Sequence, residues 1–206
     1  MTYPSLEQAY KIWREGYEYR CATTCFETKD EYIFHTKGVA EAARIIAMAT
    51  NDMDVEKAYI LGLLHDYGKK YDERKEKIFH GRRGYEELKA MGYTTSARIC
   101  LTHTFPCKEF KNEDYISYPS SCLSWVHEEL ATIEYDDYDR LIQLCDMFFE
   151  GMQKVDFKSR FKGIIGRYNL PERLFDILMK NALSLRSYFE NKTEQDIYQL
   201  LNIRAL

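Results

Sequence analysis

The sequence predicts an all-α fold from three observations. Apolar residues recur at three- and four-residue steps, which is the period of a helix, and do not alternate as they would in a half-buried strand. The β-branched content is modest, so strand signals are weak. Only 4 Pro and 10 Gly occur in 206 residues, and no internal repeat or low-complexity tract interrupts the pattern. We therefore expect helices joined by short connections.

The first and last expected helices each begin with a capping box. Ser5 and Gln8 have the spacing of such a box and open a helix that continues to about residue 19. Thr193 and Asp196 have the same spacing and are expected to open the last helix. Between them, the periodicity predicts helices over residues 31–50, 54–67, 80–91, 94–104, 120–131, 137–150, 156–166 and 171–190.

The length suits a single domain. We expect residues 1–30 to add an N-terminal helix to that domain, residues 31–150 to form its core, and residues 151–206 to form a C-terminal helical extension that covers the core. Residues 105–119 contain two prolines and little periodicity, and are predicted to form a surface loop at the rim of a site.

Composition narrows the classes of function. The net charge of -4 argues against an extended nucleic-acid surface, which requires clustered Lys and Arg. No apolar stretch approaches the ~20 residues that cross a bilayer, and no secretory signal opens the chain, so we expect a cytoplasmic protein. Six Cys without a C-x-x-C pair are expected to be reduced. The sequence does not indicate an oligomeric state.

Two polar positions lie on otherwise apolar helix faces. His35 shares its face with Val39 and Ala42, where a lone His is more often a core residue than a metal ligand. His65 and Asp66 end a buried helix, and an ionised carboxylate buried there needs a cation or a strong hydrogen-bond donor. The alternative is an Asp in a salt bridge beside a capped helix end.

A third polar position, Asp146, lies in a helix that is apolar nearly all round, so we expect its carboxylate to be buried. After Asp66, Gly68 fits a helix stop, and Lys69 is placed to complement the helix dipole or to reach a phosphate. One cation shared by His35, His65-Asp66 and Asp146 explains all three buried positions at once, because imidazole nitrogen and carboxylate oxygen are compatible ligands.

The order H…HD…D, with HDYGK close to an HDxGK signature, resembles the HD superfamily of metal-dependent phosphohydrolases over about residues 31–150. The resemblance implies an HD-type helical bundle. It also implies that His35, His65, Asp66 and Asp146 are metal ligands and that Lys69 is the lysine of the extended motif.

Two further His residues extend the resemblance. His80, followed by Gly84 in HGRRG, is similar to the H-x-x-x-G element of branches that bind two metals, and His103 in ARICLTHT is similar to their next helix. The resemblance thus implies two ions bridged by Asp66. Without a second ion, His80 would cap its helix and His103 would be a core residue.

Three other residues have less specific expectations. Arg82 and Arg83 have the geometry to clamp phosphate oxygens, although paired Arg on a helix are more often solvated. His127 matches no ligand position and is expected to be structural or to face solvent.

The resemblance implies hydrolysis of a phosphomonoester or phosphodiester, including nucleotides, by a metal-bound hydroxide, with Asp66 and Lys69 in catalytic roles. The substrate would be a small phosphorylated molecule. Iron, manganese, cobalt, nickel, magnesium and zinc all suit mixed His and carboxylate ligands. One alternative is a metal-containing regulatory or ligand-binding module without turnover. Another is a purely structural helical protein, which would require a separate explanation for each buried His and Asp.

Overall fold

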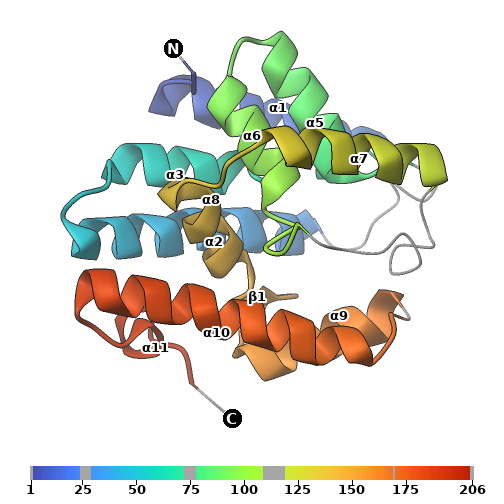
Figure 1. Ribbon diagram of the computed structural model, residues 1–206. Helices are drawn as coiled ribbons and strands as arrows, with labels where there is room; N and C mark the ends of the chain where they lie inside the picture. Colours follow the sequence, from blue (N-terminus) through green and yellow to red (C-terminus); the bar gives the residue numbers. More distant parts are fainter. Residues whose placement is uncertain (1, 24–28, 72–77, 109–118, 169, 205–206) are drawn as a thin grey trace.

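The computed structural model describes residues 2–23, 29–71, 78–108, 119–168 and 170–204 (Figure 1). Its longer helices are α1 (Leu6–Thr23), α2 (Lys29–Thr50), α3 (Val55–Leu64), α5 (His80–Ala90), α6 (Thr94–Thr102), α7 (Ser120–Thr132), α8 (Asp137–Asp146), α9 (Phe157–Tyr168) and α10 (Arg173–Thr193). The short elements are the 3-10 helix η1 (Tyr67–Lys70), strands β1 (Phe149–Glu150) and β2 (Gln153–Lys154), and helix α11 (Ile197–Leu200). These elements confirm the all-α fold class.

Helices α2 and α3 pack against each other at the centre of the molecule, and α8 packs across both (Figure 1). A Cβ added to Gly62 on α3 would lie 2.6 Å from the Cα of Ala40 on α2, so the absence of a side chain allows this close approach. Helices α1, α5, α6 and α7 lie on one side of the central helices, and α9, α10 and α11 lie on the other (Figure 1).

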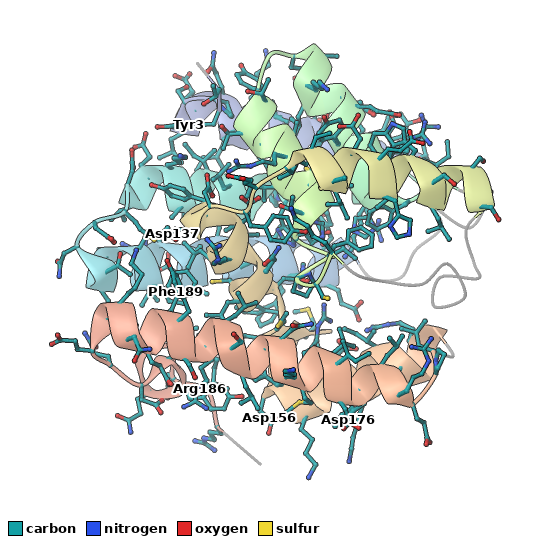
Figure 2. All side chains as sticks on the ribbon, viewed as in Figure 1. Tyr3, Asp137, Asp156, Asp176, Arg186 and Phe189 are labelled. Atoms are coloured by element: carbon teal, nitrogen blue, oxygen red, sulfur yellow. The ribbon has the colours of Figure 1, made fainter. Side chains whose placement is uncertain are left out.

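The buried apolar residues form two clusters on opposite sides of α2 and α3. One cluster joins α2 and α8 to the C-terminal helices, and Figure 2 shows Phe189 on the face of α10 that is turned towards α2. The other joins α1 and α3 to α5, α6 and α7.

The expected capping box at the first helix is present. The backbone N–H of Ser5 donates to Oε1 of Gln8 at 2.9 Å, and the N–H of Gln8 donates to Oγ of Ser5 at 3.3 Å. The box expected at the end of the chain is displaced, because α10 runs through Thr193. Asp196 is instead the N-cap of α11 and accepts from the backbone N–H of Gln199.

Two predicted helices end earlier than expected. The helix over 54–67 stops at Leu64 and is followed by η1, so the HDYGK motif spans a change of helix type. The helix over 137–150 stops at Asp146, and an antiparallel hairpin pairs β1 with β2. Gly151, at φ 57°, turns the chain between these strands. Periodicity did not reveal the hairpin because the buried Phe148 and Phe149 continue the run of apolar residues beyond the end of α8.

Of the predicted loop over 105–119, residues 109–118 lie outside the described part of the chain. Within the described residues, no disulfide joins the cysteines. None of the described helices combines the length and apolar character that crossing a bilayer requires. The division into residues 1–30, 31–150 and 151–206 stays a prediction.

Candidate metal centre

The structure brings all six predicted ligands into one cluster. The ligands come from five helices or the segments that follow them: His35 from α2, His65 as the C-cap of α3, Asp66 directly after it, His80 as the first residue of α5, His103 as the C-cap of α6, and Asp146 as the last residue of α8. Helix ends therefore supply most of the cluster.

A first group surrounds one oxygen of Asp66. His35 Nε2 lies 3.1 Å from His65 Nε2 and 3.2 Å from Asp66 Oδ2. Oδ1 of Asp146 lies 3.0 Å from His35 Nε2 and 3.8 Å from His65 Nε2. The side chains of His65 and Asp66 are almost completely buried, whereas that of Asp146 remains 18% exposed. Asp146 was expected to be buried, and it is only partly buried at the end of α8.

A second group surrounds the other oxygen of Asp66. His80 Nε2 lies 3.3 Å from His103 Nε2, and the two nitrogens lie 3.4 and 3.3 Å from Asp66 Oδ1. The rings of His65 and His103 meet edge to face at 4.9 Å between centroids. The carboxylate of Asp66 thus stands between two pairs of imidazoles, with one oxygen towards each pair.

Backbone carbonyls fix the tautomers of two of these imidazoles. His65 Nδ1 lies 2.7 Å from the carbonyl oxygen of Gly62, and His103 Nδ1 lies 3.1 Å from that of Ile99. Because a carbonyl only accepts, Nδ1 donates in each pair and Nε2 of the neutral ring carries a lone pair. Burial lowers the pKa of His103 to about 4, so this ring is neutral at pH 7.

The carboxylates facing these rings are ionised. Burial opposes ionisation of Asp66, but the nearby charge of Lys69 is the largest of the influences that outweigh it and hold the pKa well below its usual value. Burial opposes ionisation of Asp146 in the same way, and Arg160 and His35 outweigh it. Burial lowers the pKa of His35, but hydrogen bonds to Asp146 and Asp66 outweigh burial and raise the pKa overall.

This donor set fits a divalent cation. Oδ1 of Asp66 is buried and has no hydrogen-bond partner within the described residues, although the unprotonated Nε2 of His103 lies 3.3 Å from it. Lone pairs that face one another in a buried site are stabilised by a cation between them. With bonds of about 2.1 Å, neighbouring ligands of one ion are about 3.0–3.4 Å apart, which matches most separations in both groups. The triads His35–His65–Asp146 and His65–Asp66–His103 meet the distance requirement for one ion.

Gly68 and Gly84 allow the two motifs to meet. Gly68 is buried in η1 against the first turn of α5, and Gly84 faces Cys100, whose Sγ would lie 2.8 Å from an added Cβ. Gly68 was expected to stop a helix, yet it is not among the glycines with positive φ. It is required for close packing of backbones, which brings His80 beside Asp66.

Lys69 lies at the exposed edge of the cluster, where its Nζ donates to Asp66 Oδ2 at 2.6 Å and its side chain is 32% exposed. Arg82 lies over the ring of Trp125 and pairs with Glu86 at 2.8 Å, and Arg83 lies over Tyr71. The expectation that Arg82 and Arg83 hold phosphate stays a prediction.

His127 lies on α7, outside the cluster of six, as its sequence context led us to expect.

Sequence reasoning missed one residue at the cluster, Arg160 on α9. Its NH2 lies 3.4 Å from Oδ1 of Asp146, and its NH1 donates to Glu150. The available signal was its position one turn after Phe157 and one turn before Ile164, which places a charged residue on the apolar face of its helix.

A comparison with known families covers the part of the chain that holds the six residues of the cluster. The family model described as HD domain matches residues 32–148, which is more than half of the chain. The chain therefore belongs to the HD domain family, and the resemblance carried by H…HD…D is confirmed. No curated protein and no solved structure matches the chain significantly.

Proposed function

We propose that this protein is a metal-dependent phosphohydrolase that holds two divalent ions and cleaves a small phosphomonoester or phosphodiester. The observation that carries the proposal is the position of Asp66, whose Oδ2 faces His35 and His65 while its Oδ1 faces His80 and His103. A carboxylate that presents one oxygen to each of two ligand groups is suited to bridging two cations.

His35, His65, Asp66 and Asp146 would hold the first ion, and Asp66, His80 and His103 the second. Such ions supply Lewis acidity towards phosphoryl oxygens and lower the pKa of water in the site. The Nδ1–H bonds of His65 and His103 to carbonyls orient both rings before any ligand arrives. That preorganisation favours tight binding of the ions.

Lys69 would contact the phosphoryl group. Its ammonium is held at the edge of the cluster by Asp66 Oδ2, the oxygen that is proposed to bind the first ion. An ion at this oxygen would compete with Lys69 for its lone pairs, so the ammonium becomes available to a phosphate oxygen. The side chain keeps enough exposure to reach a substrate that enters from solvent.

The test begins with purified protein that is freed of metal and then titrated with Mn²⁺. We expect two ions per chain, followed by turnover in a screen of phosphorylated compounds that contains nucleoside mono- and polyphosphates. Two bound ions without turnover of any compound would favour the regulatory module instead. A parent protein that binds no divalent ion would contradict both readings.

An Asp66→Asn variant sharpens the test, with Asp176→Asn on the exposed surface of α10 as the matched control. We expect Asp66→Asn to lose both ions and to lower kcat by more than about a hundredfold, because even groups outside the ligand sphere contribute 10–100-fold. Asp176→Asn should retain the kcat and metal content of the parent. Full turnover by Asp66→Asn would overturn the proposed mechanism.

A further inference from the structure

Helix α9 lies beyond residues 32–148, which match the HD family, yet it contributes a charged side chain to the cluster. Arg160 is 12% exposed, and its Nε is buried without a hydrogen-bond partner in the described part of the chain. Burying an arginine so fully costs free energy unless its guanidinium is paired, so its partners indicate why it is there.

The guanidinium of Arg160 spans two carboxylates. NH2 faces Oδ1 of Asp146 at 3.4 Å, and NH1 donates to Oε2 of Glu150 on β1. Oδ1 of Asp146 is also the oxygen that faces His35, at 3.0 Å. The same oxygen of Asp146 therefore contacts both the imidazole of His35 and the guanidinium of Arg160.

Glu150 is itself held in place. Arg167 lies two helical turns beyond Arg160, and its guanidinium contacts Oε1 of Glu150 at 2.6 Å. A Cβ added to Gly163 would lie 2.9 Å from the same oxygen, so the glycine leaves room for Glu150 against α9. Arg167 and Gly163 thus help to hold the Glu150 carboxylate in the position where it pairs with Arg160.

Asp146 needs such support because of its place in the chain. It is the last residue of α8, where the negative end of the helix dipole disfavours a carboxylate. It is also more exposed than Asp66, so packing alone constrains it less. A fixed cation at its oxygen both offsets the dipole and limits the rotamers of the side chain.

We propose that Arg160 is a positioning residue that holds Asp146 in the orientation needed to ligate the first ion, and that Glu150 holds Arg160. The inference rests on the proposed function. It assigns to the C-terminal extension a part in building the metal centre in addition to covering the core.

The sign of the effect on metal affinity tests the proposal. A cation near a metal site repels the ion, so removal of Arg160 would tighten metal binding if charge were its only influence. If Arg160 positions Asp146, its removal weakens binding instead, by about tenfold or more, as for other groups that orient metal ligands. The measurement is the Kd for Mn²⁺ by calorimetric titration of the metal-free full-length chain, without substrate.

The matched variants are Arg160→Gln and Arg186→Gln. Arg186 on α10 also spans two carboxylates, those of Glu190 and Asp196, but at a place away from the cluster. We expect Arg160→Gln to raise the Kd at one of the two sites and Arg186→Gln to leave both sites within about twofold of the parent. An unchanged or lower Kd in Arg160→Gln would overturn the proposal.

An Arg160→Lys variant guards against a failure of Arg160→Gln to fold. Its single ammonium keeps the charge but does not span Asp146 and Glu150, so we expect a Kd between those of the parent and Arg160→Gln, or above the parent if Arg160→Gln is unfolded. A parental Kd in Arg160→Lys together with a raised KM would assign Arg160 to substrate contact and refute positioning. A parent that binds no Mn²⁺ would contradict the proposed function itself.

Discussion

Gly68 packs directly against the carbonyl group of His80: a Cβ added to Gly68 would lie 1.9 Å from that oxygen and 2.7 Å from the backbone nitrogen of Gly84. The HDYGK and HGRRG motifs therefore meet through their backbones. Asp66 and His80 face each other because η1 and the first turn of α5 are separated by no side chain at this point.

Gly68→Ala should destabilise the protein by about 3 kcal/mol or more, because backbone atoms and not a flexible side chain occupy the space of the new methyl group. Urea unfolding of the metal-free protein measures the change. Gly166→Ala on α9 is the matched control, since no atom lies within 4 Å of its added Cβ, and it should be neutral or stabilise by up to about 1 kcal/mol. Equal stability of the two variants would contradict the packing argument.

His80→Ala and His103→Ala should each reduce the metal content from two ions per chain towards one, because both imidazoles face Asp66 Oδ1. Elemental analysis after equilibration with excess Mn²⁺ measures the content. His127→Ala, on α7 and outside the cluster, should retain the parental value. A parent that never holds more than one ion would return His80 and His103 to a structural role.

Thr102→Val should destabilise the protein by about 1–3 kcal/mol, because a buried hydrogen bond to a carboxylate is lost. The Thr102 hydroxyl donates to Oδ1 of Asp139 at 2.7 Å, and burial raises the pKa of Asp139 to about 6. Thr132→Val is the control, because that hydroxyl donates to a carbonyl on the exposed surface of α7 and the change should stay within about 0.5 kcal/mol. Urea midpoints that fall equally in both variants would argue against a special role for the Thr102 bond.

Asp137→Asn should lower the free energy of unfolding at pH 7 by about 0.5–1 kcal/mol. The effect is small because solvent screens the partly exposed carboxylate of Asp137. Burial raises the pKa of Asp137, but Lys192 at 2.6 Å and Tyr188 at 2.6 Å outweigh it and lower the pKa overall. A lowered carboxyl pKa contributes stability above the unfolded value of about 3.9, and this contribution is lost as the pH falls through the folded pKa.

Urea midpoints of the parent and Asp137→Asn should therefore converge as the pH is lowered below about 4. Glu41→Gln is the control, because the exposed pair of Glu41 with Arg44 lies within one helix and contributes little. A constant difference between parent and Asp137→Asn from pH 7 to pH 3 would exclude an ionic origin for the effect.

The sequence was sufficient to predict the residues whose chemistry depends on local context. His65, Asp66 and Lys69 stand together in one short motif, and the capping box at Ser5 and Gln8 depends on contacts within four residues. The capping box follows from spacing along a helix, whereas the roles expected of His65, Asp66 and Lys69 follow from the resemblance of their motif to a family signature. Their prediction therefore needed no knowledge of how the helices pack.

Features that arise from contacts between distant segments were not predictable in this way. Arg160 joins the cluster only because β1 and β2 reverse the chain after Asp146 and lead α9 back past it. Gly68 was interpreted from the motif alone as a helix stop, whereas its neighbour in space is the carbonyl of His80. Periodicity carries no information on either packing event.

The cluster is assembled from residues spread between His35 and Asp146, and no short stretch of the chain contains a complete set for either ion. An unfolded chain therefore cannot bind the proposed ions with the affinity of the native state. By mass action, free metal at a hundred times its Kd would stabilise the folded protein by about 2.7 kcal/mol for each site. Opening of the chain to proteases would then become rarer as the free metal concentration rises, so resistance of the purified protein to proteolysis would increase with added metal.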